Sequence, residues 1–146
     1  MAHSIREQLL QTLMTLLAPI AAAEGATLLR SPVQAISREQ SPALLLFPES
    51  DTITDRYNDR LERHLIVRLV ALAREGNAPA ETLADRLLVA AHATLMRNMN
   101  LGGLALGIQE LDGEWEFEDA DATAAALPAR YQITYRTLAA DISQPG

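Results

Sequence analysis

The sequence predicts an α+β fold, with a mainly antiparallel (mixed) sheet and two main helices packed on one of its faces. Two stretches carry apolar residues at helical spacing, and several others have the two-residue period of a strand. Their order is helix, strands, helix, strands, without the regular alternation of a doubly wound parallel sheet. We expect a single domain over residues 1–146, because this length suffices for one apolar core.

The first predicted helix begins at Ser4, which forms a capping box with Glu7 three residues later. Its apolar residues recur at helical spacing: Ile5, Leu9, Leu13, Leu16, Leu17 and Ile20. Pro19 removes a backbone donor, so we expect the helix to end or kink near Ala18, with Gly25 as its stop. Polar residues among the apolar ones indicate an amphipathic helix rather than a signal peptide or a membrane span.

Several strands are predicted to follow. Segments 26–30 and 33–36 are weak candidates, whereas the apolar run 43–47 between two prolines is typical of a short buried strand. Residues 49–59 are polar and without a period, which predicts a loop. Residues 61–73 alternate apolar and polar side chains and predict a long strand, although their composition is also compatible with a helix.

The second predicted helix runs from Pro79 to about Asn98. Its apolar face is formed by Leu83, Leu87, Leu88, Ala91 and Leu95. Residues 104–111 and 114–118 are predicted strands around a turn at Gly113, with Trp115 and Phe117 on one face of the second strand. Residues 119–129 are mostly small and predict a connection with room for one helical turn.

The closing segment 129–143 has the clearest strand pattern. Tyr131, Ile133, Tyr135 and Thr137 occupy every second position, so they share one face of a strand. We expect this face to anchor the strand on the helices as part of the core. The opposite face holds Gln132, Thr134 and Arg136, where a partner subunit is expected to bind.

Composition excludes several classes of function. The net charge of −7 opposes binding to phosphate backbones, so no sequence-specific nucleic-acid binding is predicted. The chain lacks cysteine, which removes thiol chemistry and fits a reducing compartment. All twelve basic residues are arginine, which reflects either a GC-rich genome or the suitability of arginine for interfaces.

The sequence shows no carrier for catalysis or for metal binding. His3, His64 and His92 form no ligand motif, and Asp119 with Asp121 supplies too few oxygens for a cation. A nucleophile elbow, a glycine-rich phosphate loop and a zincin motif are absent from the sequence. We therefore predict a protein that is not an enzyme, with no cofactor and no metal.

An acidic run is the main charge feature. It holds Glu110, Asp112, Glu114, Glu116, Glu118, Asp119 and Asp121, with no basic residue between them. One interpretation is a solvated edge strand that resists aggregation. The other is a patch that pairs with arginines of a neighbouring subunit or repels DNA.

In order and spacing, most of the chain resembles the tail-terminator family of long-tailed bacteriophages, the minor tail protein U group. The stretches that carry the resemblance are HSIREQLLQTL, SPALLLF, RLERHLIVRLVALA, the helix after it, DGEWEFEDAD and ARYQITYRT. The pattern Tyr-x-Ile-Thr-Tyr in the last stretch resembles the ending of the family most closely.

The resemblance implies a sheet backed by helices, and subunits that form a six-membered ring on the last ring of the tail tube. Such a ring stops tube growth and offers the surface to which the filled head attaches. The implied partners are further copies of the chain, the tail tube protein and a head-completion protein, while DNA passes through the channel and no membrane is involved. The implied locations are the host cytoplasm during assembly and then the virion tail.

Candidate contacts with another subunit or with the tube follow from this resemblance. They are Asp55, Arg56, Tyr57, Asp59, Arg60, Arg63, Arg68, Glu114, Glu116, Glu118 and Arg136. Ring closure needs head-to-tail contacts, so Arg60, Arg63, Arg68 and Arg136 are expected to meet the acidic run of a neighbour, with the alternative that Arg63 points the other way from Arg68. The predicted loop 49–59 is expected to contact tube or head, because function often resides on loops carried by a rigid sheet.

Two other classes of function remain open at the level of sequence. One is a related tail or neck completion protein of a contractile tail or a bacteriocin particle. The other is a small ligand-binding domain or enzyme, which requires a pocket with convergent polar groups between helices and sheet.

Overall fold

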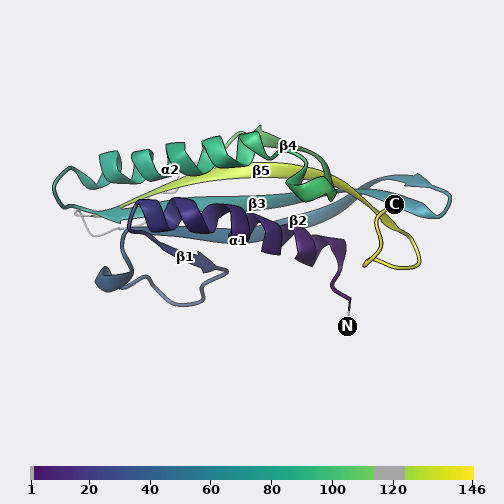
Figure 1. The fold of residues 1–146 in the computed structure, drawn as a ribbon, viewed down its shortest axis with the longest axis horizontal. Helices are drawn as coiled ribbons and strands as arrows, with labels where there is room; N and C mark the ends of the chain where they lie inside the picture. Colours follow the sequence, from purple (N-terminus) through teal and green to yellow (C-terminus); the bar gives the residue numbers. More distant parts are fainter. Residues whose placement is uncertain (1, 114–123) are drawn as a thin grey trace.

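Two long helices lie side by side on one face of a five-stranded mixed sheet (Figure 1), which confirms the predicted α+β fold. The computed structural model describes residues 2–113 and 124–146. The elements in chain order are α1 (Ile5–Ala23), β1 (Thr27–Arg30), η1 (Arg38–Gln40), β2 (Ala43–Tyr57), β3 (Arg60–Arg74), α2 (Ala80–Arg97), η2 (Leu101–Gly103), β4 (Ala105–Leu111) and β5 (Ala124–Leu138).

The sheet has the strand order β1-β2-β3-β5-β4. Strand β1 pairs with β2 in parallel, and every other neighbouring pair is antiparallel. The three central strands are each 15 residues long, and β3 pairs with β5 along its whole length, from Arg60 opposite Leu138 to Arg74 opposite Ala124. This continuous pairing makes β3 and β5 the frame on which the other elements are placed.

The core lies between the helices and the sheet. Alternate residues of β5 face the helices, and Tyr131, Ile133, Tyr135 and Thr137 are each at most 1% exposed, as predicted from their spacing. The helices contribute the apolar stripes expected from sequence, including Leu9 and Leu13 of α1 and Leu87, Ala91 and Leu95 of α2.

The prediction of a loop at residues 49–59 was wrong. Strand β2 continues through Tyr57, and a tight turn at Asn58 and Asp59 leads directly into β3. The pairing shifts register between Pro48 and Ser50 and again between Ile53 and Asp55. Such irregularities break the two-residue period, so the sequence did not reveal a strand that is specified by its pairing with β3.

The predictions for the end of the first helix and for the segment 33–36 also need correction. Helix α1 continues through Pro19 to Ala23 instead of ending near Ala18. Pro19 has no N–H, so the Thr15 carbonyl loses its helical donor. Because Thr15 and Pro19 are both exposed, this carbonyl lies on the solvent side, where water can bind it. The weak candidate 33–36 is not a strand, whereas 26–30 contains β1.

The predicted connection 119–129 was wrong for its second half, because residues 124–129 belong to β5 and pair with β3. Their small side chains gave no period in the sequence, so only the partner strand shows that they are extended. The predicted strand 114–118 and the remainder of the connection lie outside the described residues.

Helix α1 is tied to the edge strand β1 by an ion pair. The Arg30 guanidinium donates two hydrogen bonds to the Glu7 carboxylate, at 2.7 and 2.6 Å. These bonds lower the pKa of Glu7 from 4.5 to about 2. A depressed acid pKa stabilises the fold at pH above 4.5, and this contribution is lost as the pH falls from 4.5 towards 2.

Replacing Glu7 by Gln is expected to lower the free energy of unfolding by about 1–2 kcal/mol at pH 7, since both side chains are partly exposed. Because the charge of Glu7 is lost in acid, the difference from wild type should shrink between pH 4.5 and 2. Urea denaturation at several pH values measures it. Glu81→Gln, in the exposed first turn of α2, is the control; a difference that is constant with pH would contradict the prediction.

Candidate functional site

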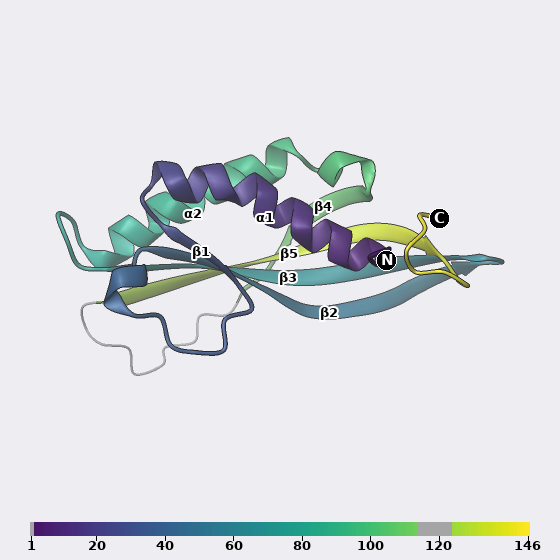
Figure 2. The same cartoon turned by 60° about the horizontal axis from the view of Figure 1, so that its bottom comes forward.

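The sheet projects past both helices as an arm (Figure 2), which we define as residues 52–64 together with 134–138. The arm consists of the β2–β3 hairpin and the end of β5, so it has three strands rather than two. Because a two-stranded hairpin alone is marginally stable in water, the third strand is important for holding the arm in shape.

The base of the arm is fastened to α1 by a buried carboxylate. The hydroxyl of Tyr135 donates a hydrogen bond to Asp51, and Arg6 of α1 lies 3.5 Å from the same carboxylate oxygen. The Asp51 side chain is only 10% exposed. Burial, together with this hydrogen bond, raises the pKa of Tyr135 far above its ordinary value, so the hydroxyl stays protonated and able to donate.

The two faces of the arm differ in what covers them. After β5 the chain turns back beside the end of that strand: the Ala139 amide donates to the Asp59 carbonyl at 2.7 Å, and Pro145 forms an antiparallel bridge with Thr137. On the helix side, the Ile5 amide at the start of α1 donates to the Ile142 carbonyl at 2.8 Å. Leu61 and Thr137 are buried on this side. We call the opposite side of the sheet, away from the helices, the open face.

On the open face of the arm, side chains from three strands form a charged network. Tyr57 donates its hydroxyl hydrogen to Asp55 at 2.8 Å, and this bond raises the pKa of Tyr57. The Arg136 guanidinium lies 5.2 Å from the centre of the Tyr57 ring, within range for a cation–π contact. Arg136 also donates from Nε to Glu62 at 3.2 Å.

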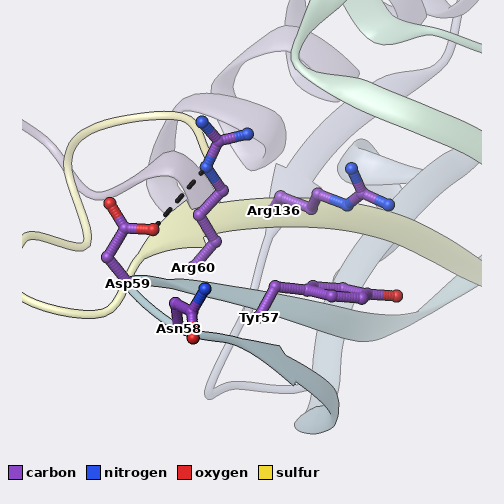
Figure 3. A pocket seen from close by; sticks show the side chains of 5 residues that line it. All are labelled: Tyr57, Asn58, Asp59, Arg60 and Arg136. Carbon is purple, nitrogen blue, oxygen red and sulfur yellow. Dashed lines mark ion pairs between the residues drawn. The ribbon is translucent and has the colours of Figure 1, made fainter.

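A shallow notch of about 380 Å³ opens at the tip of the arm, lined by Tyr57, Asn58, Asp59, Arg60 and Arg136. Figure 3 shows that Arg136 extends alongside the Tyr57 ring, whereas Arg60 turns towards Asp59. The Arg60 Nε lies 3.9 Å from Asp59 Oδ1, and both side chains are more than half exposed. Sites for small molecules are mostly apolar and enclosed, so this open charged notch suits a polar side chain of a partner better.

The open face and tip of the arm bring together five of the residues that the sequence singled out: Asp55, Tyr57, Asp59, Arg60 and Arg136. Arg56 and Arg63 lie in the rows of β2 and β3 that face the helix side. Arg63 donates there to the Thr137 hydroxyl at 3.2 Å.

Arg68 is on the open face but outside the arm, 3.9 Å from Glu49 and stacked 4.9 Å from the centre of the Phe47 ring. Glu49 also accepts a hydrogen bond from Arg130 at 3.1 Å. Arg68 is thereby separated from the notch residues. The candidates Glu114, Glu116 and Glu118 lie outside the described residues.

Sequence reasoning missed two residues of this surface. Asn58 has a φ of 54°, a left-handed conformation that asparagine tolerates well, so the Asn-Asp pair between two strands was a usable signal for a hairpin turn. Glu62 gave no signal of its own. Its role depends on lying opposite Arg136 in the β3–β5 pairing, which the sequence does not reveal.

Other chemistry is sparse in the part of the chain that the structure describes. Within residues 2–113 and 124–146, no cluster of three or more histidine or acidic side chains is arranged to hold a metal ion. His92 lies 2.7 Å from the Tyr131 hydroxyl and 3.9 Å from Glu110, so it joins α2 to β5 and β4. None of the helices described is both long and apolar enough to cross a bilayer.

The structure is that of an α+β protein with a projecting arm, and the open face of this arm carries an exposed tyrosine together with charged side chains. The sequence matches no protein-family model, and no curated protein has detectable similarity to it.

Proposed function

We propose that this protein is a tail terminator of a phage or prophage. In this proposal the chain forms a homohexameric ring on the end of the tail tube, stops polymerisation of the tube and provides the surface for head joining. Its role is structural rather than enzymatic. The proposal takes the family from the resemblance of the sequence to tail terminators. The structural observation that supports a role in assembly is the arm.

The arm supports a role in assembly for a physical reason. Tyr57 and Arg136 are residue types enriched in protein interfaces, and Tyr57 is 44% exposed on a rigid three-stranded support. Because ordered strands carry these side chains, docking costs less conformational entropy than ordering a flexible loop. A projecting surface of this kind can reach an adjacent subunit or the tube.

The proposal includes three kinds of partner: neighbouring copies of the chain, the tail tube protein and the head-completion protein. It places the protein in the host cytoplasm during assembly and later in the virion tail. The channel of the ring passes DNA without reading its sequence, in keeping with the net charge of −7.

Deleting the gene from its phage or prophage is expected to give overlong tails, because nothing then stops the tube. Electron microscopy of the particles measures tail length, and complementation with the wild-type gene is the control. In vitro, rings should form from the purified protein or on tail tubes. Tails of normal length after deletion, together with a strictly monomeric protein beside tail tubes, would refute the proposal.

The same deletion separates the proposal from a role as a neck completion protein. In that case tails would have normal length but would lack the joint to the head. The notch favours neither reading, because its charged lining suits protein contacts in both.

A further inference from the structure

The arginines on the open face differ in how far their charge is compensated within the subunit. Arg130 donates to Glu49 at 3.1 Å and to the Asp112 carbonyl at 3.2 Å. Among residues 2–113 and 124–146, the partner of Arg60 is Asp59 alone, at 3.9 Å, and these side chains are 54% and 80% exposed. Exposed pairs at such distances contribute little, so the charge of Arg60 remains available to a partner.

Arg136 completes the basic side of the notch. Within the part of the chain described, Glu62 binds it through Nε alone, so its two terminal nitrogens remain as donors. The Tyr57 ring keeps the guanidinium in place. A planar guanidinium held in this way is suited to a carboxylate, which can accept two parallel hydrogen bonds.

In the part of the chain that the structure describes, the acids at the end of β4 have no arginine paired with their carboxylates. The Glu110 side chain is 58% exposed, and the ionisable group beside it is His92, at 3.9 Å. Asp112 is also exposed, and the carbonyl of this residue rather than its carboxylate binds Arg130. The carboxylates of Glu110 and Asp112 therefore form an acidic surface, which we call the β4 end.

The notch and the β4 end cannot meet within one subunit. Strand β4 ends with Leu111 opposite Arg130, whereas Arg60 at the notch is opposite Leu138. Eight steps along β5, from 130 to 138, separate the two places, which is roughly 26 Å at about 3.3 Å per residue. Opposite charges at separate places on one chain favour contacts between copies.

We infer that the notch receives the β4 end of a second copy of this chain, with Arg60 and Arg136 binding the carboxylates of Glu110 and Asp112. This inference rests on the proposed function and names the partner of the arm. The contact joins two different surfaces, so a pair of copies keeps one unused notch and one unused β4 end. Such head-to-tail contacts continue until the ring closes.

Two charge-reversed variants test the inference. The notch variant carries Arg60→Glu and Arg136→Glu, and the end variant carries Glu110→Arg and Asp112→Arg. Each is expected to weaken self-association by about tenfold or more, since like charges now face each other. Sedimentation velocity over a range of concentrations measures the change, and circular dichroism confirms that each variant is folded.

Mixing the two variants gives the most specific result. The intact notch of the end variant can meet the intact β4 end of the notch variant, and the two reversed surfaces, Glu in the notch and Arg at the β4 end, are again opposite in charge. The mixture should therefore form assemblies in which the two variants alternate, larger than either variant forms alone. All four substitutions in one chain should restore larger assemblies, because the charges are then exchanged on both surfaces.

Controls carry a single charge reversal outside both surfaces. Arg86→Glu lies on α2, where the side chain is 65% exposed, and Glu75→Arg lies in the exposed turn after β3. Both should assemble like the wild type. An effect of Arg86→Glu equal to that of the notch variant would show that the loss does not depend on the notch.

The outcomes separate this inference from the proposed function. If both variants assemble like the wild type, or if their mixture assembles no better than either variant alone, the inference is wrong. Overlong tails after gene deletion would leave the proposed function standing in that case. A wild-type protein that stays monomeric beside tail tubes would overturn both.

Discussion

The Tyr135→Ala variant is expected to lose about 3–5 kcal/mol of its free energy of unfolding, as is typical when a buried aromatic ring is removed from a core. Tyr135 is 1% exposed and lies at the base of the arm, on the side that faces the helices. Small domains are stable by only about 5–15 kcal/mol, so this loss is a large fraction of the total. Urea denaturation followed by circular dichroism measures it.

Tyr135→Phe separates the two roles of this side chain. The ring remains, but Asp51 loses the hydroxyl donor at a place where its carboxylate is 90% buried. We expect a cost of about 1–3 kcal/mol from the buried carboxylate that is left without this partner. A phenylalanine variant as unstable as the alanine variant would show that the hydrogen bond, not the ring, dominates.

Leu69→Ala is the second variant with a large expected effect. Leu69 is fully buried in the centre of β3, paired with Leu46 on one side and Ala129 on the other. Removing it leaves a cavity beneath the helices, and the free energy of unfolding should fall by about 2–5 kcal/mol.

The neighbouring residue provides the matched control for Leu69. Val70 lies on the open face and is only partly buried, so Val70→Ala should cost about 1 kcal/mol or less, since it removes less buried surface. Thermal unfolding of the pair compares the two faces of one strand. Equal losses would contradict the assignment of the core to the helix side.

The helices and the regular strands were predictable because local patterns specify them. Helical spacing predicted both ends of α2 to within one residue. The two-residue period predicted β3 and the buried row of β5. Ser4 also caps α1 as predicted, with the Glu7 amide donating to the Ser4 hydroxyl at 3.0 Å, whereas the Glu7 carboxylate of the predicted capping box accepts from Arg30 and Gln11.

The arm was not predictable in the same way, although seven of its residues were candidate contacts in the sequence analysis. Residues 49–57 carry mostly polar side chains and interrupted alternation, because this part of β2 is largely exposed and shifts register twice. Its extended form depends on hydrogen bonds to β3, which is a property of two segments together.

By itself, the sequence determined the α+β class, the two amphipathic helices and which face of the last strand is buried. These depend on the period of apolar residues, and burial of apolar surface is the dominant favourable term in folding. Only the tertiary structure decided that Tyr57, Arg60 and Arg136 share one notch while Arg63 faces the other side. Strand register places residues distant in sequence opposite one another, and a shift of one residue would reverse every face.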